Sequence, residues 1–212
     1  MTIPTGATFD LGCTNIDAQG SLLMDSGQII NADSIGIGVL GVLEGGSGSI
    51  SVGGNWDNSG TFIPGTSTVV FADGCSVTPA QLTGNTTFHN LTLISTNGRT
   101  FVFPAGSNIT VNGTLTLQGA PGLPIQLVSS SGQAAVIALG PNAQVVRSNA
   151  NASPNVQIGA ISSATAIPTL NEYGLMILAL LLAAMAARQI DPSPFARRMA
   201  RGKSHREENH GK

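Results

Sequence analysis

Short runs in which apolar and polar residues alternate recur through the first 160 or so residues of the chain. A period of two is typical of a half-buried β-strand, because successive side chains point to opposite faces of a sheet. Turn signals such as Asp73-Gly74, Asn97-Gly98 and Asn112-Gly113 separate the runs. The pattern therefore predicts a body that is almost entirely β. Its expected strands include residues 8–11, 49–52, 68–71, 90–93, 108–111 and 114–117.

The spacing of the later runs narrows the architecture. Their apolar centres are Leu117, Leu127, Ile137, Val146 and Val156. At that spacing, a coil of two or three strands would hold roughly 20 to 30 residues, which suits a parallel β-helix or solenoid whose turns pack on one another. An antiparallel β-sandwich is the alternative, because similar strand spacings also fit that fold. We expect an all-β, solenoid-like body over residues 1–161.

A different pattern appears near the C-terminus, where residues 175–187 are apolar on every face of a helix. That run alone would span roughly 20 Å, against a hydrocarbon core of roughly 30 Å, but a helix that begins at Thr169 is long enough. Pro168 suits a first helical position and Tyr173 suits the membrane interface. The pattern predicts a spacer at residues 162–166 and one transmembrane helix within residues 167–187.

Charge divides the chain at the same place. The formal net charge is −2, yet Arg99 and Arg147 are the only lysine or arginine residues before the apolar run. The tail of residues 188–212 is strongly basic. Its arginines include Arg188, Arg197, Arg198 and Arg201. The positive-inside rule places this tail in the cytoplasm and the body outside, so we expect a single-pass membrane protein and no nucleic-acid partner.

A polar motif stands at the start of the predicted span. It consists of Ile167, Pro168, Thr169 and Leu170, followed by Tyr173 and Gly174. This segment resembles the IPTL-CTERM sorting signal of bacterial proteins, which has the pattern IPTLxxWG and is related to PEP-CTERM signals. The chain has Tyr173 where that pattern has tryptophan, another amphipathic interfacial aromatic. Its tail also runs beyond the few arginines that usually end such signals.

The resemblance implies a partner enzyme. An exosortase, an integral-membrane cysteine protease or transpeptidase, would cleave in or near the motif and release or re-anchor the body at the bacterial cell surface. The chain would then be the substrate and not the enzyme. Residues 53–62, 86–93 and 115–119 in turn resemble repeats of secreted bacterial solenoid surface proteins. This second resemblance implies a right-handed parallel β-helix without implying an activity.

The N-terminus shows neither the basic region nor the apolar region of a signal peptide. Because a body outside the cell requires export, we predict that this sequence begins inside a longer reading frame. Cys13 and Cys75 allow one disulfide, which an oxidising envelope compartment permits. Neighbouring turns would bring their Cα atoms within about 6 Å, whereas a separation of three turns would not. The sequence leaves their pairing open.

Residues for catalysis or metal binding are sparse. The body has no CxxC pair, and His89 is its only histidine, so we expect no metal and no cofactor. Its carboxylates are scattered, which favours a non-enzymatic surface or matrix protein. The alternative is a carbohydrate-binding or carbohydrate-active protein with an extracellular polysaccharide as partner. Its sugar platform would be Trp56 beside Asp57, although a turn with a packed tryptophan explains this pair more simply.

Overall fold

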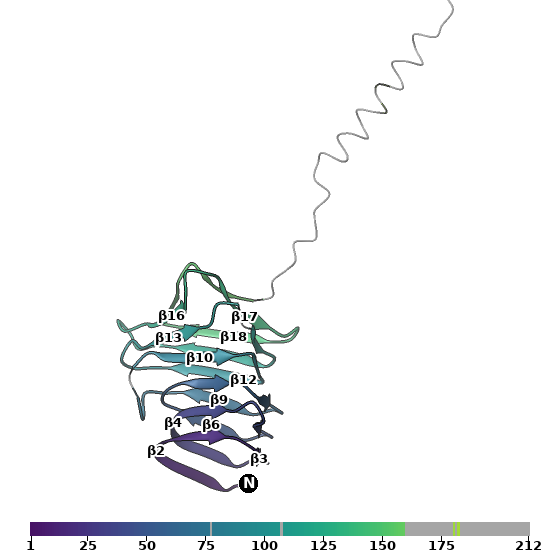
Figure 1. Ribbon diagram of the computed structural model, residues 1–212. Coiled ribbons are helices and arrows are strands. Elements are labelled where there is room, and N and C mark those ends of the chain that lie inside the picture. The colour runs from purple at the N-terminus through teal and green to yellow at the C-terminus, as the bar shows by residue number, and fades with distance from the viewer. Residues whose placement is uncertain (77, 107, 160–179, 181, 183–212) are drawn as a thin grey trace, which may run out of the picture. The chain divides into compact units, whose positions relative to one another are not determined.

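The strands of the body form a parallel β-solenoid, with successive turns stacked along one axis (Figure 1). The computed structural model describes residues 1–76, 78–106, 108–159, 180 and 182. Within these ranges every pair of strands is parallel. Paired residues in successive turns are between 18 positions (Thr14 and Ala32) and 30 positions (Leu115 and Val145) apart. About seven turns are present, so the predicted solenoid is confirmed and the β-sandwich is excluded.

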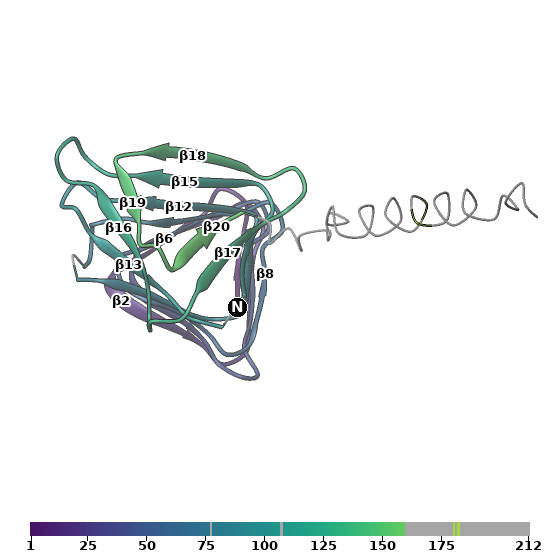
Figure 2. The same ribbon diagram turned by 90° about the horizontal axis from the view of Figure 1, so that it is seen from above.

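The solenoid has a triangular outline when it is seen along its axis (Figure 2). The first side comprises β1 (Thr2–Ile3), β3 (Ser21–Met24), β5 (Val42–Glu44), β8 (Thr61–Ile63), β11 (Thr86–Phe88), β14 (Asn108–Val111), β17 (Ala135–Leu139) and β20 (Val156–Ile158). The second side comprises β2 (Thr8–Ala18), β4 (Gln28–Ile37), β6 (Ser49–Val52), β9 (Thr68–Phe71), β12 (Asn90–Ile94), β15 (Thr114–Gln118) and β18 (Gln144–Ser148). The third side comprises β7 (Trp56–Asn58), β10 (Ala80–Gly84), β13 (Thr100–Phe103), β16 (Ile125–Ser129) and β19 (Ala150–Ala152). The long strands β2 and β4 continue round the corner, so the second and third sides share one twelve-stranded sheet.

Apolar columns inside the solenoid explain why these runs become strands. On the second side Ile29, Ile50, Val69, Leu91 and Leu115 pair in succession from turn to turn, and all five are buried. Each buried side chain packs on the equivalent side chain of the next turn, so the core is continuous along the axis. The six runs predicted from alternation all lie within observed strands. Those strands are β2, β6, β9, β12, β14 and β15.

Aromatic side chains fill the interior near the middle of the solenoid. Trp56 is completely buried, and its ring centroid lies 4.9 Å from that of Phe62 and 5.2 Å from that of Phe88. Its indole Nε1 donates a hydrogen bond of 3.2 Å to Thr86 Oγ1, which satisfies the only polar atom of the ring. Trp56 is therefore a core residue. The packed tryptophan, which the sequence favoured, is confirmed, and the alternative of a sugar platform at Trp56 and Asp57 is wrong, because only Asp57 is exposed.

The two ends of the solenoid differ in character. Phe9, Leu11 and Ile16 in the first turn are partly buried and pack against the core from one side. In the last described turns Arg147 pairs with Leu117, so a cation occupies the end of an apolar column. Arg147 donates from Nε (2.9 Å) and Nη2 (2.6 Å) to the Ala150 carbonyl oxygen. A charge at this place discourages a further strand from pairing with β18.

The chain divides into two units, Met1–Ile161 and Ser162–Lys212. The first unit contains the solenoid. The predicted spacer (162–166), span (167–187) and tail (188–212) fall in the second unit and, apart from Leu180 and Leu182, lie outside the described residues. Over the ranges that the structure does describe, we find no helix with the length and apolar character needed to cross a bilayer.

Candidate functional site

The residues predicted to form the sorting signal lie outside the described part of the chain. These are Ile167, Pro168, Thr169, Leu170, Tyr173 and Gly174, together with Arg188, Arg197, Arg198 and Arg201 of the basic flank. Their roles therefore remain predictions from the sequence. Two polar features stand out in the described body: the corner that holds the disulfide, and a groove on the outside of the third side.

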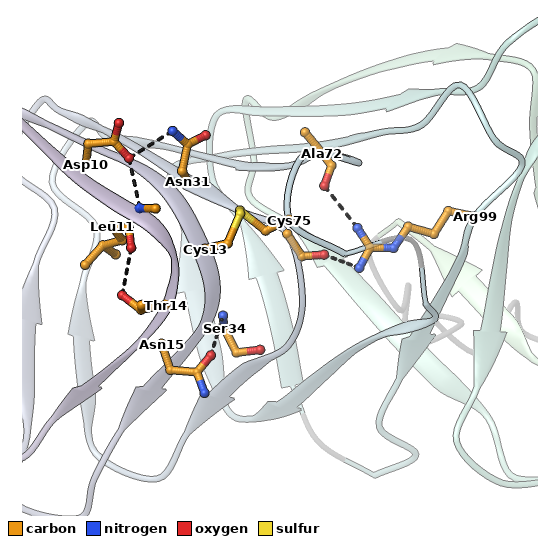
Figure 3. Close-up of a disulfide and its surroundings, with 12 residues drawn as sticks. Asp10, Leu11, Cys13, Thr14, Asn15, Asn31, Ser34, Ala72, Cys75 and Arg99 are labelled. Carbon is orange, nitrogen blue, oxygen red and sulfur yellow. Dashed lines mark hydrogen bonds between the residues drawn. A yellow bond between two sulfur atoms is a disulfide. The ribbon is translucent and has the colours of Figure 1, made fainter.

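A disulfide joins Cys13 to Cys75 at the corner between the second and third sides, with 5.2 Å between their Cα atoms (Figure 3). Each turn is counted from its strand on the first side, so the first turn starts at β1, the second at β3, the third at β5, the fourth at β8 and the fifth at β11. Cys13 belongs to the first turn and Cys75 to the fourth, so the expectation that three turns are too far apart is wrong. Both cysteines lie where the chain departs from regular pairing. Cys13 has a φ of 66° within an irregular part of β2, and Cys75 lies in the loop between β9 and β10. A Cβ atom on Gly53 would stand 2.8 Å from Cys75 Cβ, so the glycine makes room for this loop.

Asp10 holds the loop that carries Cys13. Its Oδ1 accepts hydrogen bonds from the Gly12 amide (3.0 Å) and from Asn31 Nδ2 (2.9 Å), as Figure 3 shows. The bond from Gly12 and then that from Asn31 lower the pKa of the Asp10 carboxyl, because both favour its charged form. Asn31 has a φ of 53°, a left-handed conformation that asparagine adopts more readily than most residues. The second turn thus supports the loop of the first.

Asp10→Asn should give a small, acid-sensitive loss of stability. A carboxylate whose pKa is lowered by folding stabilises the folded state above its unfolded pKa, and this contribution is lost as the pH falls through the folded pKa. We therefore expect the variant to melt below the wild type at pH 7 and the difference to shrink toward zero in strong acid. Asp25→Asn, an exposed site at another corner, is the matched control. A difference independent of pH would contradict this role for Asp10.

Arg99 ties three turns together at the same corner. Its side chain is only 3% exposed and donates from Nε to the Thr78 carbonyl (2.7 Å), from Nη1 to Ala72 (3.1 Å) and from Nη2 to Gly53. Gly53 lies in the third turn, Ala72 and Thr78 in the fourth, and Arg99 in the fifth. Burial lowers the pKa of the guanidinium, while nearby carboxylates oppose that shift. In the sequence, Arg99 stood out only as one of two basic residues in the body. Nothing in the sequence indicated that it would bind carbonyl oxygens of other turns.

A polar groove of about 470 Å³ lies on the outside of the third side, across the first four turns. One of its two columns contains Asn15, Ser34, Asn55 and Gln81. The other contains Asp17, Gly36, Asp57 and Thr83, which pair in succession from turn to turn. Its lining contains no aromatic residue. Asp57 therefore lies in the groove among other polar side chains, and no aromatic ring stands beside it there.

Hydrogen bonds between turns fix the first column of the groove. The Ser34 amide donates to Asn15 Oδ1 (3.1 Å), and the Asn55 amide donates to Ser34 Oγ (3.0 Å). The Gln81 amide donates to Asn55 Oδ1 (2.9 Å). Because both asparagine oxygens accept these bonds, the Nδ2 groups of Asn15 and Asn55 are the donors that remain available to a ligand. The side chains are therefore held in a fixed orientation by the fold itself.

The same tripeptide pattern supplies both charged positions of the groove. Asn15-Ile16-Asp17 and Asn55-Trp56-Asp57 share an Asn-x-Asp pattern with an apolar residue at the centre. Register pairs Ile16 with Ile35 and Ile35 with Trp56, so the two tripeptides lie two turns apart on one side. This repetition is the sequence signal of the groove, but turns of unequal length hide the fact that the two tripeptides lie on one side. In the residues that the structure describes, the groove included, no group of three or more His, Cys, Asp or Glu side chains could hold a metal ion.

Comparisons with known proteins bear on the C-terminal segment. Residues 165–198 match the family model of the IPTL-CTERM motif, a span that contains the sorting residues predicted from the sequence and extends to Arg198. No curated protein and no solved structure matches the chain. An IPTL-CTERM motif therefore follows a β-solenoid body of about seven turns, a combination that suggests an exosortase-sorted protein of the cell envelope or surface.

Proposed function

We propose that this chain is a non-enzymatic protein displayed at the bacterial cell surface after an exosortase has processed its C-terminal segment. The observation that carries the proposal is the IPTL-CTERM match at residues 165–198, placed directly after the folded body. In this proposal the body is exported first and the C-terminal segment is processed afterwards. The solenoid is then the exported domain, and the C-terminal segment is its sorting signal.

The proposed arrangement in the envelope follows from the apolar run and the charges beside it. Residues 167–187 span the membrane, and Arg188, Arg197, Arg198 and Arg201 keep the tail on the cytoplasmic side. The body lies outside, where an oxidising compartment lets the Cys13–Cys75 disulfide persist. Cleavage in or near the motif separates the body from the tail.

The shape of the body supports display as its role. A solenoid grows in one dimension by stacking turns, and it presents long continuous sides to its surroundings. In this body the buried columns consist mainly of apolar side chains, while serine, threonine and asparagine dominate the outward positions of strands such as β6, β12 and β15. Such a protein offers surface for contact with other components of the envelope or matrix.

Processing can be followed on the full chain, expressed behind a cleavable secretory leader and carrying an epitope tag after Lys212. In a bacterium that has the cognate exosortase, we expect the tag to be separated from the body, and in the exosortase deletion strain we expect it to stay attached. Pro168→Ala with Thr169→Ala should block processing in the first strain, because both residues lie in the signal. Immunoblots against the body and the tag measure the processed fraction.

Two further variants make this experiment specific. Ser204→Ala with His205→Ala changes two residues of the tail beyond the matched segment and should leave processing unchanged. Tyr173→Trp restores the aromatic residue of the family pattern and should also be processed. If the wild type is processed to the same extent with and without the exosortase, the proposed function is wrong.

A further inference from the structure

We propose that the polar groove on the third side binds a linear, uncharged polysaccharide whose chain runs along the axis of the solenoid. This goes beyond the proposed function, because sorting depends on the C-terminal segment whereas the groove is formed by the first four turns of the body. The inference rests on three properties of the groove: its repeated polar groups, its dimensions and its charge.

The repeated groups match the hydroxyls of a sugar. Each Asn-x-Asp tripeptide offers an amide donor from asparagine and a carboxylate acceptor from aspartate. A sugar hydroxyl both donates and accepts, so adjacent hydroxyls on one ring can satisfy the two groups together. The Asn55 side chain is held in place because its Oδ1 accepts a hydrogen bond from the Gln81 amide. Asp17 Oδ1 accepts a hydrogen bond of 2.6 Å from Gln19 Nε2. Such fixed groups lose little conformational freedom when a ligand binds.

The dimensions match a polymer and not a single sugar. Neighbouring parallel strands lie about 4.8 Å apart, so the two Asn-x-Asp tripeptides repeat after roughly 10 Å along the axis. One sugar unit of an extended polysaccharide advances by a distance similar to one turn, which places alternate units beside the two tripeptides. Between them stands Gly36, which adds no side chain of its own to the groove, and the Asp17 carboxylate oxygen lies 3.4 Å from the place that a Cβ atom would take there. A polymer therefore meets the same groups repeatedly as it runs along the groove.

The charge of the groove selects the class of polysaccharide. Asp17 and Asp57 are its only ionisable residues, so its lining contains no cation to pair with an acidic sugar. A polymer of uronic acids would bring its carboxylates beside these two aspartates and would be repelled. A neutral polymer avoids this repulsion while keeping the hydrogen bonds. With no aromatic ring in the groove, each contact is weak, and display of many copies at a surface would raise the overall avidity.

The test uses the purified full chain in mild detergent, immobilised through a C-terminal tag. The probes are linear hexasaccharides of glucose, mannose and xylose, an alginate oligomer and a chitosan oligomer, each tested at low and high salt. We expect at least one neutral hexasaccharide to bind with little dependence on salt, and the alginate oligomer not to bind. No binding of any neutral hexasaccharide would overturn the proposal. Binding confined to chitosan and lost in high salt would also overturn it, because that is simple charge attraction.

Variants place the binding in the groove. Asp57→Ala and Gly36→Thr should each weaken binding about tenfold or more, the first by removing an acceptor and the second by placing a branched side chain between Asp17 and Asp57. Both sites face outward on strands, and a Cβ atom on Gly36 would approach no atom closer than 3.4 Å, so the fold should survive. Asp25→Ala makes the same change in charge away from the groove and should bind normally. If both groove variants bind like the wild type while melting normally, the groove is not the site.

Discussion

Arg99→Met is expected to lower the free energy of unfolding of the body by about 3 to 5 kcal/mol, because buried carbonyls left without a donor cost about 1 to 3 kcal/mol each. The three carbonyls belong to Gly53, Ala72 and Thr78, in two different turns. Arg99→Lys should recover only part of the loss, since an ammonium cannot reproduce the planar fork of donors. Denaturant unfolding of the full chain, followed by far-ultraviolet circular dichroism, measures the change.

Arg147→Met is the matched control for this prediction. Arg147 is also an arginine bound to backbone, but both of its hydrogen bonds go to the single carbonyl of Ala150 at the end of the solenoid. Its replacement should cost about 1 kcal/mol, the ordinary net value of one hydrogen bond. Equal losses at Arg99 and Arg147 would show that the link between turns contributes nothing beyond a local contact. An unchanged stability of Arg99→Met would contradict the prediction outright.

The solenoid was predictable because its signals are local. Alternation along β6, β9 and β15 shows which residues point inward, and the interval between apolar centres limits a turn to roughly 20 to 30 residues. The same alternation of polar and apolar residues predicts the burial of Trp56. It stands between the polar residues Asn55 and Asp57, and if these face outward then the tryptophan must face the core. The sorting motif is more local still, since it is a contiguous run of residues recognised without any fold.

The groove and the corner depend on contacts that alternation does not specify. Turns differ in length by up to twelve residues, from 18 to 30, so the sequence alone does not show which outward residues share a column. The disulfide requires the loop between β9 and β10 to cross the third turn at Gly53, a local excursion with no periodic signal. Arg99 likewise reaches carbonyl oxygens up to 46 positions away. Backbone carbonyls are present in every residue, and their choice of partner is decided only by the packed structure.

Removing the Cys13–Cys75 disulfide should destabilise the body by about 4 kcal/mol, the loop-closure value for a bridge that encloses about 60 residues. The sequence separation of the two cysteines is 62, and the enclosed chain comprises most of the first four turns. Because each turn of a solenoid contacts only its neighbours, the loss should be concentrated in these turns. Hydrogen exchange should therefore accelerate in β2, β4 and β6 but not in β14 and β17.

The comparison is between the oxidised wild type and the double variant Cys13→Ser with Cys75→Ser, with wild type in reductant as a second route to the same state. Uniform acceleration of exchange along the whole body would contradict a local role, and unchanged stability would contradict the prediction itself. The same variant links the disulfide to the groove. Asn15 and Asp17 follow Cys13 directly in β2, so loosening the first turn displaces one Asn-x-Asp tripeptide while the other stays in β7 and its preceding loop. Glycan binding should then fall in reductant, which confines a binding-competent body to the oxidising side of the membrane, where the sorting signal is proposed to deliver it.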